Sequence, residues 1–169
     1  MIRSFNYVMI LLIMLFNLIK LEKLYMKIKV GDKILHADLE DNSSVTELVK
    51  KFPLTVKMEN LYEREMCYRF GSGTLPAEEA KTNGYEIGDI IYWPPKGSFV
   101  ILYKQNGEKF EIQPIGHICE DVSFFSDISE VDITFELTEE YNKDECVKSS
   151  YSSILRYNKF IYFLLLLFV

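Results

Sequence analysis

Residues 84–118 constrain the fold of this chain more than any other stretch. Two short apolar runs, residues 87–93 and 99–103, are rich in β-branched and aromatic residues, which favours strands with at least one buried face. A Pro-Pro pair at 94–95 separates the runs, and the first strand must end there because proline cannot donate to a sheet ladder. A third run follows at residues 110–118. Three short strands cannot bury their faces alone, so the rest of the chain must close around them.

Turn residues in this stretch predict how the three strands connect. The Asn-Gly pair at 106–107 is a strong signal for a tight hairpin. Gly116, inside the third run, indicates a bend or a bulge. The three strands are therefore predicted to form a β-meander.

The flanking sequence predicts further strands and one clear helix. Alternating or strongly β-favouring residues predict strands at residues 26–30, 34–39, 54–58, 66–70 and 131–137. Apolar residues recur at helical spacing from Val45 to Phe52, and Pro53 stops that helix. Ser44 followed by Glu47 is a capping-box pattern at its start.

The predicted elements fit a small closed barrel. Residues 75–83 are expected to form a loop or a single helical turn, and residues 122–128 a short helix. The total is seven or eight short strands and one or two helices within residues 26–137. Closing these strands into a barrel removes exposed edges, so the fold is predicted to be mainly β, a small closed β-barrel with one or two short helices.

The segments on either side of this domain, residues 26–137, differ from it in composition. Residues 1–25 contain an apolar run at 5–19, which is shorter than the ~20 residues that a spanning helix usually needs. The segment is interpreted either as a signal-anchor-like extension or as a non-native start upstream of Met26, and both readings stay open. Residues 138–169 are predicted to be a polar tail with a short apolar terminus. The core domain is expected to be cytoplasmic or, alternatively, anchored to a membrane through the first segment.

Composition argues against several classes of function. Residues 26–137 contain 12 Lys and Arg against 20 Asp and Glu, unlike the basic surfaces that bind nucleic acid. Cys67, Cys119 and Cys146 form no close-spaced pair, so they match neither a zinc site nor a disulfide framework and are expected to be reduced. Two distant histidines and no Cys–His pair give no constellation for metal or nucleophilic catalysis, and no cofactor is predicted.

Two strings in the central stretch resemble a known family. Residues 85–95 read Tyr-Glu-Ile-Gly-Asp-Ile-Ile-Tyr-Trp-Pro-Pro, and residues 98–103 read Ser-Phe-Val-Ile-Leu-Tyr. Both are similar to the bacterial and archaeal cyclophilin-like proteins, and the predicted strands on either side fit the same pattern over residues 26–137. Members of that family are small single domains with a cyclophilin-type barrel and mostly unassigned function, so the resemblance implies this barrel.

True cyclophilins are peptidyl-prolyl isomerases, and the resemblance to them is partial. Residues 67–70 are similar to the stretch that carries the cyclophilin catalytic arginine, which makes Arg69 the candidate catalytic residue. The segments that carry the cyclophilin glutamine and histidine are missing. We therefore expect a non-catalytic module that binds a peptide or a small molecule, with weak isomerase activity as the alternative. The candidate ligand-binding residues are Phe70, Tyr92 and Phe99.

Trp93 is the only tryptophan, and two readings of it stay open. It could belong to the binding groove beside Arg69 and the three aromatic residues. We expect instead that it is a buried packing residue, because it ends a buried strand and the Pro-Pro pair fixes the chain after it. Truncating such a residue typically costs ~3–5 kcal/mol.

Overall fold

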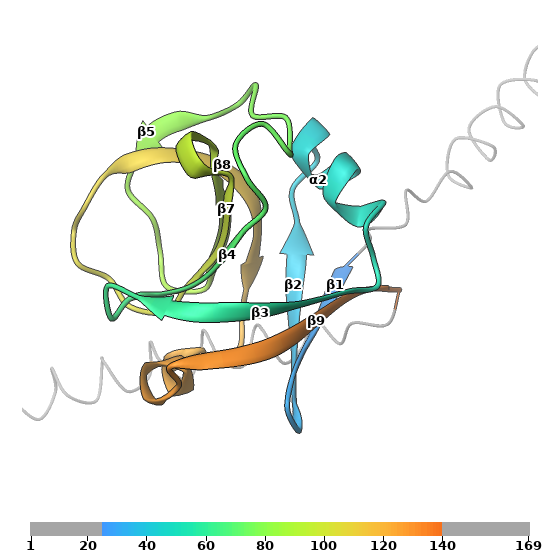
Figure 1. Cartoon of the computed structure of the whole chain (residues 1–169), viewed down its shortest axis with the longest axis vertical. Coiled ribbons are helices and arrows are strands. Elements are labelled where there is room, and N and C mark those ends of the chain that lie inside the picture. Colours follow the sequence, from blue (N-terminus) through green and yellow to red (C-terminus); the bar gives the residue numbers. More distant parts are fainter. Residues whose placement is uncertain (1–24, 140–169) are drawn as a thin grey trace, which may run out of the picture.

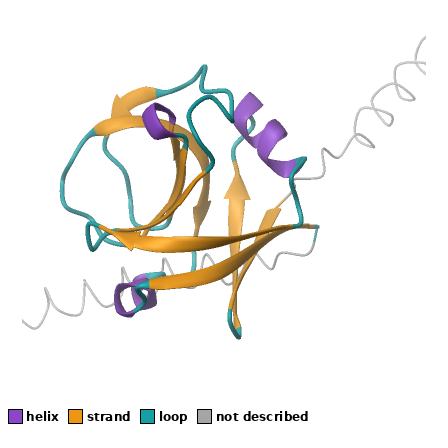
Figure 2. Ribbon diagram, in the orientation of Figure 1, coloured by secondary structure: helices purple, strands orange, loops and turns teal. Residues whose placement is uncertain are grey.

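The computed structural model describes residues 25–139, which are drawn in colour in Figure 1. Strands dominate this part of the chain (Figure 2). They are β1 (Tyr25–Val30), β2 (Lys33–Leu39), β3 (Leu54–Leu61), β4 (Glu65–Arg69), β5 (Lys81–Asn83), β6 (Asp89–Trp93), β7 (Ser98–Leu102), β8 (Phe110–Ile118) and β9 (Glu130–Thr138). The helices are α2 (Ser43–Val49) and two 3-10 helices, η1 (Pro94–Lys96) and η2 (Ser123–Asp127).

The strands form a closed antiparallel barrel. Eight of them follow the order β2-β1-β9-β3-β4-β7-β6-β8, and β8 returns to pair with β2. Closure leaves this ring without an unpaired edge, and it confirms the predicted mainly β fold with a small closed barrel. The short β5 pairs with the first part of β8, so the predicted loop or helical turn at residues 75–83 ends in a strand.

Alternate side chains of the ring strands fill the barrel interior. Met26 and Ile28 of β1 point inward, as do the matching positions of the other strands, and this is the period-2 pattern from which the strands were predicted. The Phe99 ring packs against Phe135 with 5.0 Å between centroids. Helix α2 and η2 add apolar side chains to the same core from different sides of the barrel (Figure 2).

The barrel closes at Gly116. This residue pairs with Leu39 of β2 on one side and with Ile90 of β6 on the other. A Cβ at this position would lie 2.2 Å from the backbone oxygen of Asp38, so glycine is needed for the close approach. The register with β6 shifts between Gly116 and Pro114, which is a β-bulge, and the predicted bend or bulge is confirmed.

The order of the three central strands differs from the prediction. Strand β6 lies in the middle and pairs with β7 on one side and β8 on the other. The predicted meander with a tight hairpin at 106–107 is therefore wrong. Residues 103–109 form a longer connection outside the barrel, where the Tyr85 hydroxyl donates to Asn106 Oδ1 at 2.9 Å. The chain forms no hydrogen-bonded turn or sharp bend at residues 106–107, so the Asn-Gly signal does not decide which strands pair.

Helix α2 begins at a different cap from the one predicted. The Asn42 side chain accepts a hydrogen bond from the Val45 backbone N–H at 3.0 Å. Ser44 is buried in the first turn, where its hydroxyl donates to the Pro76 carbonyl. The predicted capping box of Ser44 and Glu47 is wrong, because Asn42 is an equally good capping residue and comes first.

A second apolar layer covers the outside of the barrel over β4, β7 and β6. All five residues of β7 are buried, so both of its faces are packed. We call the buried members of this layer the outer cluster: Cys67, Tyr85, Ile91, Val100, Leu102 and Ile112. Trp93 packs against it and is only partly buried, because Tyr92 takes the inward position on β6. The prediction of a buried Trp93 is wrong.

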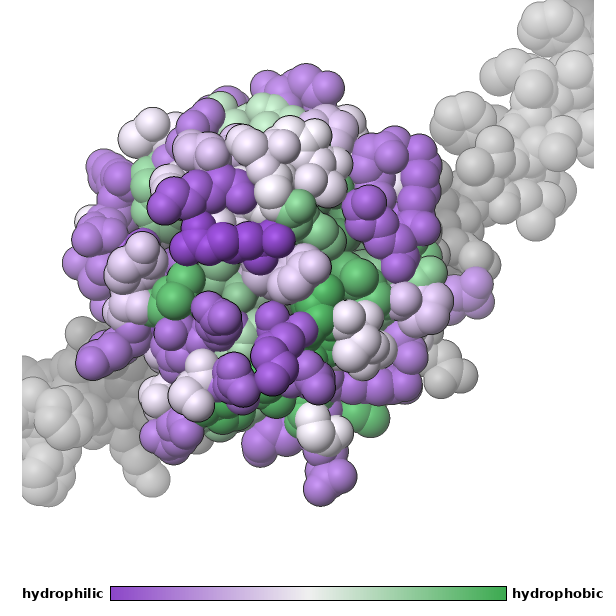
Figure 3. Space-filling model, in the orientation of Figure 1, coloured by the Kyte–Doolittle hydropathy of each residue, from purple (hydrophilic) through white to green (hydrophobic). Residues whose placement is uncertain are grey.

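Some predictions concern residues that lie outside the described part of the chain. They include the apolar run at 5–19 and nearly all of the polar tail. Between residues 25 and 139, no helix has the length and apolar character needed to cross a membrane. The face of the molecule drawn in Figure 3 is mostly hydrophilic, with apolar residues in small separate patches.

The two cysteines of the described part differ in state. Cys67 is a free and buried thiol, whereas Cys119 is disulfide-bonded. The expectation of reduced thiols is therefore confirmed for Cys67 and wrong for Cys119.

Candidate functional site

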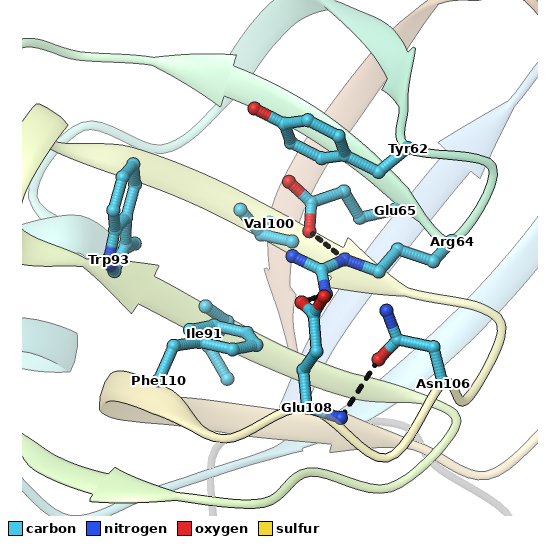
Figure 4. A pocket seen from close by; sticks show the side chains of 9 residues that line it. All are labelled: Tyr62, Arg64, Glu65, Ile91, Trp93, Val100, Asn106, Glu108 and Phe110. Carbon is cyan, nitrogen blue, oxygen red and sulfur yellow. Dashed lines mark hydrogen bonds and ion pairs between the residues drawn. The ribbon is translucent and has the colours of Figure 1, made fainter.

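A pocket of about 270 Å³ opens on the outside of the barrel, beside the outer cluster (Figure 4). We call it the outer pocket, and it is lined by Tyr62, Arg64, Glu65, Ile91, Trp93, Val100, Asn106, Glu108 and Phe110. In Figure 4, Trp93 and Arg64 stand on opposite sides, with Ile91 and Val100 between them. No single stretch of sequence contains this site, because its residues come from β4, β6, β7, β8, one hairpin and one loop.

The floor of the outer pocket is apolar because of strand register. Ile91 of β6 lies directly opposite Val100 of β7, and both side chains point away from the barrel interior. Trp93 follows two residues after Ile91 and therefore projects from the same face. Phe110, at the start of β8, supplies a second partly buried ring. The result is a flat apolar floor between aromatic walls.

The hairpin between β3 and β4 supplies the polar side of the pocket through a strained turn. Tyr62 and Glu63 have φ angles of 56° and 51°, in the left-handed region that is uncommon for residues other than glycine. The Arg64 N–H donates to the Leu61 carbonyl at 3.2 Å and closes the turn. Tyr62 is 72% exposed and contributes its ring to the pocket lining. Strain of this kind concentrates at functional sites.

Arg64 connects the two acidic residues of the outer pocket. Its Nε donates to Glu65 Oε2 at 3.1 Å, and its Nη1 donates to Glu108 Oε2. The guanidinium carbon lies 5.4 Å from the centroid of the Tyr62 ring and 5.2 Å from that of Phe110. The Arg64 side chain is only 12% exposed, so this cation is held between carboxylates and rings.

The pKa values at the site follow from burial and from these ion pairs. Burial raises the pKa of Glu65, although the charge of Arg64 opposes this. The hydrogen bond from Arg64 lowers the pKa of Glu108. For Arg64 itself burial acts against the charged form, but the hydrogen bond to Glu108 and the charge of Glu65 outweigh it and raise the pKa. The pocket lining therefore combines one firmly charged guanidinium with two carboxyl groups.

Side-chain hydrogen bonds fix the loop that carries Glu108. Gln105 Oε1 accepts from the backbone N–H groups of Asn106 and Gly107 at 2.9 and 2.7 Å. Asn106 Oδ1 accepts from the Glu108 N–H at 3.1 Å and from the Tyr85 hydroxyl. The loop is thus tied to the outer cluster, and Glu108 is placed within reach of the Arg64 guanidinium.

The residues predicted as a site do not share one face of the sheet. Tyr92 and Phe99 are fully buried in the barrel interior, and the Phe70 ring lies 5.9 Å from that of Phe99. Arg69 is exposed, and the alternation of side chains along β4 directs it to the outer face of the barrel, away from these three rings. Of the residues considered for the binding groove, Trp93 alone lines the outer pocket. The roles assigned to the other four stay predictions.

Sequence reasoning missed Arg64, Glu65 and Glu108 because each lies in a stretch that reads as a polar turn. One signal was present in the apolar run at 99–103, which is continuous instead of alternating. A strand of this kind is buried on both faces, so it requires a cover outside the barrel. The edge of that cover is where the outer pocket lies.

A titratable pair lies apart from the outer pocket, at the closure of the barrel. His117 Nδ1 lies 2.8 Å from Asp89 Oδ1, and Asp89 Oδ2 accepts from the Glu86 N–H. The hydrogen bond to Asp89 raises the pKa of His117, although burial opposes the shift. Among residues 25–139, no group of His, Cys, Asp and Glu side chains is arranged to hold a metal ion.

The described residues form a small closed antiparallel barrel with a pocket on its outer face, and the comparisons with known proteins agree on the fold. Residues 28–138 match the model of the Cyclophilin-like family, so the chain belongs to this family. No curated protein matches the chain. The structure is similar to the solution structure of a hypothetical protein from Archaeoglobus fulgidus, with a TM-score of 0.51, 14% identity and coverage of 68% of this chain and 94% of that one. At that identity the likeness shows the fold alone.

Proposed function

We propose that this domain is a non-catalytic binding module and that the outer pocket is the site where it holds a peptide side chain or a small molecule. The observation that carries the proposal is the composition of the pocket: an apolar floor, aromatic walls and a small number of fixed polar groups. This is the usual composition of ligand sites in proteins.

The size of the outer pocket sets the size of the ligand. Its volume of about 270 Å³ lies just below the ~300 Å³ at which sites for drug-sized ligands begin. The pocket therefore suits one amino-acid side chain or a molecule of similar size. A longer peptide would place one residue in the pocket and run over the surface beside it.

The polar groups favour binding over chemistry. Arg64 Nε and Nη1 are both occupied by carboxylates, so neither is free to polarise a substrate. The lining contains no Ser, Thr, Cys, His or Lys side chain, and each of its two carboxyl groups is bonded to Arg64. The fixed groups instead provide shape and charge for recognition.

A ligand-detected NMR screen of small fragments and short peptides tests this proposal. Phe110→Ala removes one aromatic wall of the outer pocket. Phe124→Ala is the matched control, because Phe124 is also a partly buried phenylalanine but belongs to η2 and does not line the outer pocket. Ligands that lose affinity in the first variant and keep it in the second support the proposal. Ligands that bind both variants as they bind the unmodified protein contradict it.

Weak prolyl isomerase activity is the second candidate function, and it rests on the match of Arg69 to the cyclophilin arginine. The structure gives this candidate little support, because Arg69 lies on the opposite face of β4 from Phe70. An assay with a proline-containing peptide decides it.

A further inference from the structure

We propose that the ligand of the outer pocket carries a primary ammonium group on an aliphatic stem, as a lysine side chain or a free alkylamine does. This inference rests on the proposed function and specifies the chemistry of the ligand at the same site. Four observations on the pocket lead to it: its charge, one open carboxylate oxygen, its rings and its floor.

The lining of the outer pocket carries an excess of negative charge. Among the lining residues, Glu65 and Glu108 are acidic, Arg64 is basic and the others are uncharged. Two further cations stand outside the lining: Arg69, whose charge also acts on Glu65, and Lys96 beside the Trp93 ring. The domain around it is also acidic, with 12 Lys and Arg against 20 Asp and Glu over residues 26–137. The charge of the lining itself and the overall field of the acidic domain therefore attract a cation and repel an anion.

Glu65 presents one carboxylate oxygen that is still open. The residue is only 7% exposed, and its Oε2 accepts from Arg64. Within residues 25–139, Oε1 has no hydrogen-bond partner, and Figure 4 shows it on the side of Tyr62, directed away from Arg64. This oxygen is not one of the solvent-sealed polar atoms without a partner in the described residues, so water reaches it and a donor on a ligand can replace that water.

The single open oxygen favours an ammonium group over a guanidinium. A guanidinium pairs best with both oxygens of a carboxylate, and Arg64 already occupies one of them. An ammonium group is a compact charge that needs only one acceptor. It fits the position that Glu65 leaves open.

The rings of the outer pocket already attract cations of the protein itself. The Arg64 guanidinium lies over the rings of Tyr62 and Phe110, and the Lys96 ammonium lies 6.0 Å from the centroid of the Trp93 ring. The same ring faces favour a ligand cation. The apolar floor between them takes a methylene stem, since long amines bury their stems and keep the charged head at a polar group.

Titrations with four probes test the inference on the full chain. The indole N–H resonance of Trp93 reports binding without ambiguity, because the chain has one tryptophan. The probes are n-pentylammonium, neutral pentan-1-ol, anionic pentanoate and the peptide acetyl-Gly-Lys-Gly-amide. The first three share a stem and differ in charge, and the fourth presents the ammonium group on a polypeptide.

Two variants assign the effect to Glu65. Glu65→Gln removes the charge of the open carboxylate, and Glu63→Gln removes the same charge two residues away, outside the pocket lining. We expect pentylammonium to bind at least tenfold more tightly than pentan-1-ol, and pentanoate more weakly than both. The preference should fall by tenfold or more in Glu65→Gln and stay unchanged in Glu63→Gln.

The outcomes separate this inference from the proposed function. If pentan-1-ol and pentylammonium shift the Trp93 resonance with equal affinity, the pocket binds ligands but the inference of a cation is wrong. If the ammonium preference survives in Glu65→Gln, the assignment to this carboxylate is wrong. If no probe shifts the resonance, both proposals fail for ligands of this size. Tighter binding of the peptide identifies a polypeptide as the source of the amine, and tighter binding of pentylammonium identifies a free amine.

Discussion

Phe99 and Trp93 lie on opposite faces of the same part of the sheet, and the account predicts very different costs for removing their rings. Phe99 is fully buried in the barrel interior, in contact with the Phe70 and Phe135 rings. A buried aromatic ring removes ~200 Å² from water, which at ~25 cal/mol per Å² is worth ~5 kcal/mol. The real gain is smaller, because unfolded chains are compact and already bury part of this area. Phe→Ala substitutions in protein cores cost ~3–5 kcal/mol.

Trp93→Ala is expected to cost far less. Its ring is partly exposed and borders an open pocket, so its removal leaves no closed cavity. We expect ~1–2 kcal/mol, within the range of ordinary substitutions. For a domain slightly larger than 100 residues, each kcal/mol lowers the melting temperature by ~4 °C. Phe99→Ala should therefore lower it by ~12–20 °C, and Trp93→Ala by ~4–8 °C.

Thermal unfolding followed by far-ultraviolet circular dichroism measures both values. Phe99→Leu, which keeps most of the volume, gives a milder comparison if the alanine variant does not fold. Similar melting temperatures for Phe99→Ala and the unmodified protein would refute the assignment of Phe99 to the interior. A larger loss for Trp93→Ala than for Phe99→Ala would refute the assignment of Trp93 to the outer face.

Three further predictions test the domain, the chemistry and one ion pair. Residues 26–137 expressed alone should unfold in one cooperative transition, since the apolar alternation starts and stops there; a gradual melt would contradict this boundary. Isomerase activity on a proline-containing peptide should be weak or absent, and turnover like that of a true cyclophilin, lost in Arg69→Ala, would show the opposite. Because Asp89 raises the pKa of His117, the pair stabilises the fold fully below about pH 6.5 and less as the pH rises through the folded-state pKa. The free energy of unfolding should thus fall with rising pH above neutrality more steeply in the unmodified protein than in His117→Gln. If it falls equally steeply in both proteins, the Asp89–His117 pair does not stabilise the fold.

The fold could be predicted from the sequence because its strands obey local rules. Alternation in residues 26–30 and 131–137 located β1 and β9 to within a residue at each end. Gly116 marked the bulge at which the barrel closes. The pairing order could not be predicted in the same way, because the Asn-Gly pair at 106–107 is only a local signal and the structure forms no turn there. Which strand lies in the middle depends on contacts between distant segments.

The candidate site was mostly hidden for a related reason. Arg64 and Glu108 are separated by more than forty residues, and they meet only because a loop crosses the outside of the barrel. Arg69 was named as the candidate catalytic residue because similarity to a motif points to a residue type and a position, but it does not report the face of the strand. Trp93 was recognised as important, yet its side of β6 is decided by the neighbouring Tyr92, which fills the interior.

The central claim is that the outer pocket is the ligand site of this domain, and contacts between a bound ligand and the protein test it most directly. Isotope-filtered nuclear Overhauser spectra, recorded with the tightest ligand from the screen, measure these contacts. The account predicts cross-peaks from the ligand to the methyl groups of Ile91 and Val100 and to the ring of Trp93. Cross-peaks confined to residues around the Asp89–His117 pair, with none to Val100, would contradict it.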